Sequence, residues 1–351
     1  MSKLEKKRAF GKTGLCIPSI TFGTSCLGNL YRELEWDAKL GIVREWFNCV
    51  ACPIFADSAG KYGAGLALEE MGKALKELHI PSDSIVISNK LGWLRAPLET
   101  PEPRFEPGTW AGLKHDAVHD ISYEGIFKCW EEGLSLLGGE YNTELLSVHD
   151  PDEYLASASD RASMNKRMED IREAYRALAE IKKKGKAKAI GVGAKDWKTI
   201  RLISDIAELD WVMFANSLTV MRHPPELLRF MEELAAHGVG IVNSAVFHAG
   251  FLSGGDYFDY RLVSESNPSD APLFAWRSKF KALCERFGTS PAAACVQFGL
   301  SVPGVVSVSL NTSRSDRVQE NVSLVDTQID PVFWTAMKDN GLISEKYPYL
   351  G

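Results

Sequence analysis

The chain has 351 residues, of which 45% are hydrophobic and 25% are charged, and its formal net charge is −6. This composition is typical of a globular protein, and the acidic balance argues against a general nucleic-acid binder, whose surface would be basic. No run approaches the ~18 consecutive apolar residues of a membrane span, and the charged N-terminus lacks the apolar stretch of a signal peptide, so we expect no membrane association.

The seven cysteines are scattered, and their one close pair is Cys49 and Cys52. A zinc or redox site would need a second pair or nearby histidines, and the sequence offers neither. We therefore expect reduced thiols, no metal and a cytoplasmic location. We also expect a small-molecule partner and a monomer or homodimer.

The first half of the chain begins with a short predicted hairpin over residues 7–17, centred on Gly-Lys-Thr-Gly. The elements predicted after it are a strand at 17–22, a helix at 36–47, a strand at 53–56, a helix at 65–78, a strand at 84–89, a helix at 123–137 and a strand at 145–148. A long proline-rich insertion over residues 91–122 separates the third strand from its helix. A loop of this length in a compact domain is usually functional or disordered, and its two tryptophans argue against disorder.

In the second half of the chain, predicted helices and strands continue to alternate. Its predicted elements are a helix at 165–184, a strand at 187–192, a helix at 197–207, a strand at 211–215, a helix at 224–236, a strand at 239–242, helices at 276–287 and 291–300, a strand at 305–309, and helices at 314–324 and 331–342. A second long insertion follows the seventh strand, over residues 247–277.

Eight alternating strand–helix units predict a parallel sheet with helical crossovers, and eight repeats favour closure into a (β/α)8 TIM barrel. We expect one barrel domain over residues 1–351, with an N-terminal hairpin and long substrate loops. Periodicity alone does not separate a barrel from an open doubly wound sheet. The open dinucleotide-binding fold is disfavoured because no Gly-x-Gly-x-x-Gly follows the first strand.

Four polar residues that follow the second, third and fourth strands carry the predicted chemistry: Asp57, Tyr62, Lys90 and His149. On a barrel these positions converge on one rim. A tyrosine is a weak acid or base at neutral pH, and a lysine ammonium beside it should lower the pKa of the phenol. A carboxylate keeps that lysine charged, and a histidine orients a carbonyl or hydroxyl. The set suits proton transfer coupled to hydride transfer at a carbonyl carbon.

The motifs around these residues, taken in order, resemble the aldo-keto reductase family over nearly the whole chain. FADSAGKYG at residues 55–63 is similar to its Asp-Thr-Ala-x-x-Tyr-Gly motif. The other matching segments are SNK at 88–90, LLSVHDPD at 145–152, AIGVGAKDW at 189–197 and NTSRSDRVQENV at 311–322. Within the family, HDPD, GVG and NSAVFHAGFLSGG most resemble the aldose 1-dehydrogenase branch, the L-galactose, L-fucose and D-threo-aldose dehydrogenases.

The resemblance implies that Asp57, Tyr62, Lys90 and His149 form the catalytic tetrad and that the protein binds a nicotinamide cofactor. It places the cofactor against Gly23, Asn216, Ser244, Phe247, Gly250, Leu252, Thr312, Ser313, Arg317, Glu320 and Asn321. Two positions depart from the family pattern. Gly193-Ala194 replaces the usual Ser-Asn, and Asn311 stands where many NADP-preferring members carry lysine. We expect NAD as cofactor, with NADP possible through Arg314 and Arg317.

The insertions supply candidate substrate contacts. Trp93, Trp110 and His119 in the first could cap the substrate or simply pack within their loop, and His248 after the seventh strand could reach the substrate or lie at the surface. The implied function is NAD(P)-dependent oxidation of the C1 hydroxyl of a free aldose, such as L-fucose, L-galactose or D-arabinose, to the lactone. The alternatives are an NADPH-dependent carbonyl or aldehyde reductase, a pyridoxal 4-dehydrogenase and a non-enzymatic nucleotide-binding regulatory subunit.

Overall fold

The computed structural model describes residues 3–259 and 261–350, and its centre is a closed parallel barrel. The barrel strands, in spatial order from β3, are β3 (Ile20–Gly23), β4 (Ile54–Ala59), β5 (Ile85–Leu91), β8 (Leu145–His149), β9 (Ala189–Ala194), β10 (Trp211–Ala215), β11 (Gly240–Ser244) and β14 (Val305–Leu310). The predicted (β/α)8 fold is confirmed, and spatial order follows chain order because each crossover returns to the next strand.

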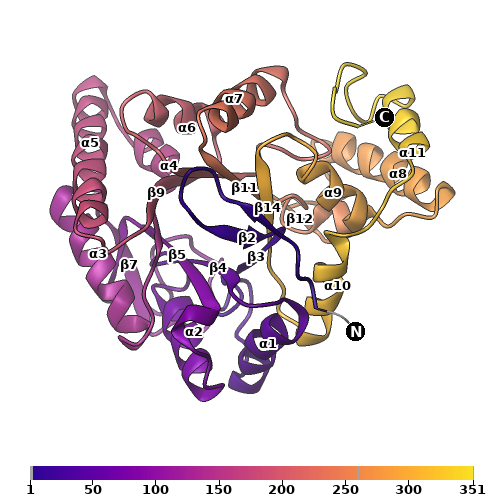
Figure 1. The fold of residues 1–351 in the computed structure, drawn as a ribbon. Coiled ribbons are helices and arrows are strands. Elements are labelled where there is room, and N and C mark those ends of the chain that lie inside the picture. The colour runs from indigo at the N-terminus through magenta and orange to yellow at the C-terminus, as the bar shows by residue number, and fades with distance from the viewer. Residues whose placement is uncertain (1–2, 260, 351) are drawn as a thin grey trace.

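Helices form a ring around the barrel (Figure 1). They are α1 (Trp36–Cys49), α2 (Leu66–Glu77), α3 (Tyr123–Leu136), α4 (Pro151–Ala156), α5 (Arg161–Lys183), α6 (Trp197–Ser204), α7 (Pro225–Ala236), α8 (Ala271–Arg286), α9 (Pro291–Gly299), α10 (Val318–Leu324) and α11 (Pro331–Asp339). In the described parts of the chain, no helix is both long and apolar enough to cross a membrane.

The N-terminal hairpin closes one end of the barrel. It consists of β1 (Lys7–Ala9) and β2 (Cys16–Pro18), and it crosses the barrel opening that faces the viewer in Figure 1. Phe10 at its turn is fully buried, with its ring 6.2 Å from that of Phe55 and 6.1 Å from that of Trp211. Apolar packing therefore fills this end, which leaves the opposite rim, at the carboxyl ends of the strands, for chemistry.

Strand boundaries differ from the prediction where polar residues were read as strand ends. β4 continues through Asp57 to Ala59 and β5 continues through Lys90, and Ala59 pairs with Lys90. These polar side chains belong to the strands themselves, because the backbone ladder persists while the side chains project into the rim. The single strand expected over 17–22 is divided, since Ile17 pairs in the hairpin while Ile20 pairs with β14.

The two insertions contain structure that the sequence did not predict. In the first, β6 (Trp93–Pro97) and β7 (His115–His119) pair antiparallel. In the second, β12 (Tyr257–Phe258) pairs with β13 (Arg261–Leu262), and α8 begins earlier than expected, at Ala271. Helix α4 was also missed. Strands β6 and β7 are separated by a long segment without a local hairpin signal, so long-range packing decides their pairing.

Candidate active site

A buried ion pair lies at the base of the site. The Lys90 Nζ donates to Asp57 Oδ2 at 2.5 Å and to the backbone oxygen of Ser58 at 3.2 Å, and Ser88 Oγ donates to the other Asp57 oxygen. Asp57 and Lys90 are each 2% exposed. Their parent strands β4 and β5 are hydrogen-bonded neighbours, so the barrel itself fixes the pair.

Tyr62 lies in the turn after β4, above this ion pair. The Lys90 Nζ is 4.6 Å from the centroid of the Tyr62 ring. The His149 and Tyr62 rings meet edge-on, with their centroids 5.5 Å apart. Gly63 has φ +61°, and a Cβ there would stand 2.3 Å from the Gly28 carbonyl oxygen. The motif's Tyr-Gly pair is thus required sterically, because only glycine lets the turn approach the neighbouring loop. The structure brings all four predicted catalytic residues together.

The protonation of Tyr62 differs from what the sequence predicted. Burial, with the Asp57 and Asp150 carboxylates, raises the pKa of Tyr62 well above its usual value, although Lys61 and Lys195 act in the opposite direction. The expectation of a lowered pKa is therefore wrong for the chain alone, because burial, the largest effect, favours the neutral phenol and the two carboxylates add to it. Burial also holds the pKa of His149 well below its usual value, so its imidazole is neutral.

A cavity of about 580 Å³ runs from the tetrad to α10, and all four tetrad residues line it. The predicted cofactor residues that line it are Gly23, Ser244, Phe247, Gly250, Thr312, Ser313, Arg317, Glu320 and Asn321. Asn216 instead borders an adjoining cavity of about 260 Å³, and Leu252 is fully buried beneath the loop. The buried Asn216 Oδ1 has no hydrogen-bond partner among the described residues, which suits an incoming amide donor such as the nicotinamide carboxamide.

At the distal end of the cavity, the two arginines that line it are already paired with carboxylates. Arg317 forms an ion pair with Glu320 at 3.1 Å, and the Arg314 Nε donates to Asp316 at 3.0 Å. The Asn311 Nδ2 donates to Ser25 Oγ at 2.8 Å. This end therefore offers a hydrogen-bonding surface of little net charge.

Gly193, at the departure from the usual Ser-Asn, has a packing role. A Cβ at this position would stand 2.9 Å from Lys90 Cδ, and Lys90 cannot retreat while Asp57 holds its ammonium. The missing side chain thus leaves room for Lys90.

The candidate substrate residues separate into two groups. Trp110 lines the cavity, with its ring 6.0 Å from that of Tyr62. Trp93 and His119 face each other across the β6–β7 hairpin with rings stacked at 4.3 Å, outside both cavities. Burial lowers the pKa of His119 to about 4.

His248 is fully buried behind the site rather than in it. Its Nε2 lies 2.7 Å from Thr219 Oγ1 and its Nδ1 lies 2.6 Å from Asp259 Oδ1. The Phe258 ring stacks on the imidazole at 4.6 Å. His248 therefore fastens the second insertion to the loop after β10.

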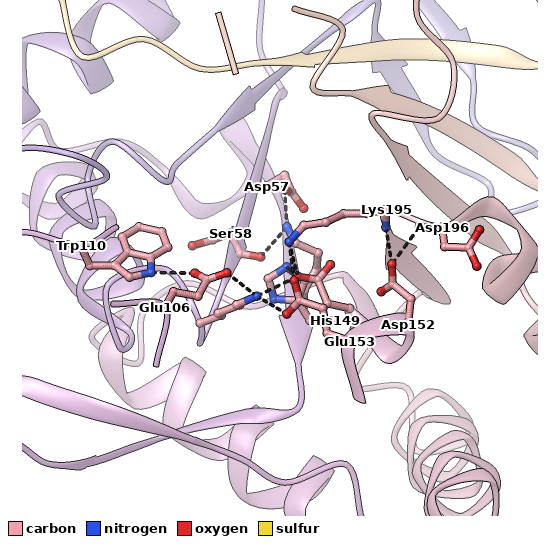
Figure 2. Close-up of polar contacts among 12 residues, drawn as sticks. Asp57, Ser58, Glu106, Trp110, His149, Asp152, Glu153, Lys195 and Asp196 are labelled. Carbon is pink, nitrogen blue, oxygen red and sulfur yellow. Dashed lines mark hydrogen bonds and ion pairs between the residues drawn. The ribbon is translucent and has the colours of Figure 1, made fainter. Parts of the chain in front are cut away.

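A cluster of charged residues beside the tetrad was not predicted as part of the site. Figure 2 shows Glu106, Glu153 and Lys195 gathered beside His149, and Lys61 and Asp150 complete the cluster. Only Lys61 and Asp150 carry a sequence signal, because Lys61 precedes Tyr62 and Asp150 follows His149. Within the described residues, no group of three or more His, Cys, Asp or Glu side chains is arranged to hold a metal ion.

The fold matches solved structures over its full length. A glycerol dehydrogenase from Gluconobacter oxydans superposes with a TM-score of 0.69, covering 98% of this chain and 99% of that one at 17% sequence identity. At this identity the likeness establishes the fold alone.

Characterised relatives match with similar completeness. Pyridoxal 4-dehydrogenase of Microbacterium luteolum is 29% identical over 97% of this chain and 99% of its own length. D-threo-aldose 1-dehydrogenase of a Pseudomonas species is 28% identical over 95% and 97%, and L-galactose dehydrogenase of Arabidopsis thaliana is 25% identical over 93% and 89%. The Aldo/keto reductase family model matches residues 19–340, which include every barrel strand and the whole tetrad, and the chain therefore belongs to the aldo/keto reductase family.

Proposed function

We propose that the protein is an NAD(P)-dependent dehydrogenase that oxidises the C1 hydroxyl of a free aldose to the lactone. The observation that carries this proposal is the convergence of the Asp57–Lys90 pair, Tyr62 and His149 at one end of a long cavity whose nearby wall is polar and aromatic. Two relatives named as sugar dehydrogenases support the substrate class.

The residues divide the work by their chemistry. A bound nicotinamide cofactor would supply the hydride acceptor. The Tyr62 phenolate accepts the proton of the C1 hydroxyl and becomes the neutral phenol, and the Lys90 ammonium 4.6 Å from the ring stabilises the phenolate before this transfer. Neutral His149 hydrogen-bonds the reacting oxygen and orients it. The Trp110 ring covers the substrate beside Tyr62 and helps to exclude water.

We further propose that NAD is preferred. The 2′-phosphate of NADP would need an uncompensated cation, whereas Arg314 and Arg317 are each paired with a carboxylate and Asn311 is neutral. Titration of the protein with both nucleotides checks this, and a lower dissociation constant for NADP would contradict it.

Oxidation of pyridoxal is the second candidate, because Pyridoxal 4-dehydrogenase is 29% identical to this chain and the Trp110 and Tyr62 rings offer faces to a pyridine ring. A reductase role uses the same tetrad in the opposite direction. A purely regulatory nucleotide-binding role would leave the intact tetrad without a purpose.

A cofactor-reduction screen separates these functions. The protein is incubated with NAD or NADP and with L-fucose, L-galactose, D-arabinose or pyridoxal, and reduced cofactor and lactone are measured. We expect turnover with an aldose, and a Tyr62→Phe variant that binds NAD but is slower by a factor of ~100 or more, since it lacks the base. Equal rates for the two proteins would contradict the assignment of Tyr62, and turnover of pyridoxal alone would favour the second candidate.

A further inference from the structure

The charged cluster beside the tetrad is centred on Lys61, whose side chain is buried in the cavity wall. Its ammonium lies 2.8 Å from Glu106 Oε1, 3.0 Å from Asp150 Oδ2 and 2.7 Å from Glu153 Oε2. Burial by itself would lower the pKa of Lys61, but the three carboxylates raise it well above its usual value. The ammonium is therefore charged at any physiological pH and fixes all three carboxylates.

Burying this charged cluster costs free energy, and proton transfer by the tetrad does not require the cluster. Each buried ion loses several kcal/mol of hydration free energy, and in some proteins such groups are kept for specificity rather than stability. Lys61, Glu106, Asp150 and Lys195 all line the cavity next to Tyr62 and His149. The cluster thus faces the place where the part of the substrate beyond the reacting carbon would lie.

Glu106 has the geometry of a ligand-binding group. It reaches the cavity from the loop of the first insertion, and it borders both the 580 Å³ cavity and the adjoining 260 Å³ cavity. Its Oε1 is bound by Lys61, and its Oε2 accepts from Trp110 Nε1 at 2.8 Å. Each carboxylate oxygen has two lone pairs, so both oxygens are oriented and each retains acceptor capacity.

We propose that Glu106 is a specificity-determining residue that accepts hydrogen bonds from hydroxyl groups of the substrate away from the reacting carbon, with Lys61 and Trp110 holding it in place. This inference rests on the proposed function and narrows its substrate class to carbonyl compounds and hemiacetals that carry neighbouring hydroxyl donors. The Lys61 and Lys195 ammonium groups offset much of the charge of Glu106, Asp150 and Glu153, so the cluster offers oriented hydrogen-bond acceptors that suit a neutral polyol.

Such a site should discriminate between substrates that carry these hydroxyl groups and substrates that lack them. A site that hydrogen-bonds a substrate hydroxyl strongly rejects the analogue without it, because the buried acceptor is then left unpaired. D-erythrose and butanal have the same number of carbons but differ in their hydroxyl groups. The wild-type protein should therefore reduce D-erythrose with a kcat/KM at least about tenfold higher than that for butanal.

The test compares Glu106→Gln with Glu99→Gln in the same insertion, whose side chain is 70% exposed and pairs with Arg104. Both are assayed for reduction of D-erythrose and butanal. Binding of L-galactose is measured by calorimetry on NAD-loaded proteins that also carry Tyr62→Phe, so that turnover does not obscure binding. We expect Glu106→Gln to raise the KM for D-erythrose by about tenfold and to weaken L-galactose binding similarly, with butanal kinetics changed less than about twofold. Glu99→Gln should behave as wild type.

A merely structural role for Glu106 predicts a different pattern. Equal losses for D-erythrose and butanal, or no change for either, would overturn the inference, as would a wild-type protein that does not distinguish the two aldehydes. Should Glu106→Gln fail to fold, Glu106→Asp keeps the charge while shortening the reach and carries the same expectation. Failure of the proposed function would appear separately, as a wild-type protein that discriminates between the aldehydes but oxidises no aldose.

Discussion

At the scale of single residues, the site is a set of compensated charges around one ionisable phenol. Lys90 is held by Asp57 at 2.5 Å, and Lys61 is held by three carboxylates. Ion pairs of this kind bring little net stability, but they fix positions, because each partner left alone would be a buried unpaired charge. The ionisation of Tyr62 responds to both groups, because Asp57 and Asp150 raise its pKa while Lys61 lowers it.

The pH profile should reveal this environment. Because burial and the Asp57 and Asp150 carboxylates raise the pKa of Tyr62, the phenolate fraction, and with it the rate of oxidation, should rise with pH throughout the alkaline range. Removing the Asp150 carboxylate should lower the pKa of Tyr62. In the Asp150→Asn variant, the alkaline rise of kcat with pH should therefore occur at lower pH. The control is Asp160→Asn, at the exposed start of α5, where asparagine also caps a helix. An alkaline limb that stays in place or moves to higher pH would contradict the role of Asp150.

At the scale of elements, the two insertions are held over the rim by different means. The first depends on the β6–β7 hairpin, the Trp93–His119 stack and the Glu106 contacts. The second depends on His248, and it also meets the loop after β3, where Tyr31 stacks on Tyr257 at 4.7 Å. Both insertions are thus fastened by side-chain contacts made outside the barrel ladder.

Acid should loosen the first insertion through His119. Its folded-state pKa is about 4 against 6.5 for an ordinary histidine, so the unfolded chain takes up this proton first as the pH falls. Because of this residue, the free energy of unfolding should fall by up to about 3 kcal/mol between pH 6.5 and pH 4. Above pH 6.5 His119 should make no such contribution. His119→Phe keeps a ring against Trp93 and should remove that part of the loss.

The measurement is thermal unfolding of wild type and variant across this pH range. The matched control is His115→Phe, at the other end of the same strand, opposite Pro97. If wild type and His119→Phe lose equal stability between neutral and acidic pH, the buried neutral imidazole is not the cause.

At the scale of the whole molecule, the barrel separates stability from chemistry. The hairpin end is filled by Phe10, Phe55 and Trp211, while the predicted catalytic side chains all lie at the opposite rim. This division is general for the fold, since the loops at the carboxyl ends of the strands can vary without disturbing the layers below.

Phe10→Ala tests this separation. Removing a fully buried phenylalanine should lower the free energy of unfolding by about 3–5 kcal/mol, as measured by urea denaturation. The dissociation constant for NAD and the kcat of the folded variant should stay near wild type, and Phe10→Leu should be affected much less. A large loss of kcat in a fully folded Phe10→Ala protein would show that the two ends are coupled.

The sequence by itself predicted the eight barrel strands, most of the helices and the four polar residues that meet at the rim. These features are local, because hydrophobic periodicity specifies each element and the end of each parallel strand specifies where its polar residue lies. The positions of Asp57, Lys90 and His149 on one rim follow once the strands are in order. The hairpin β6–β7 and helix α4 left no comparable local signal.

Only the tertiary structure decided the direction of the loop side chains. It turned His248 into the core, stacked Trp93 on His119 outside the cavity, placed Trp110 within it, and brought Glu106 to Lys61 across 45 residues of sequence. The physical reason is that a side chain on an irregular segment has no fixed periodicity, so its direction is set by contacts with distant segments.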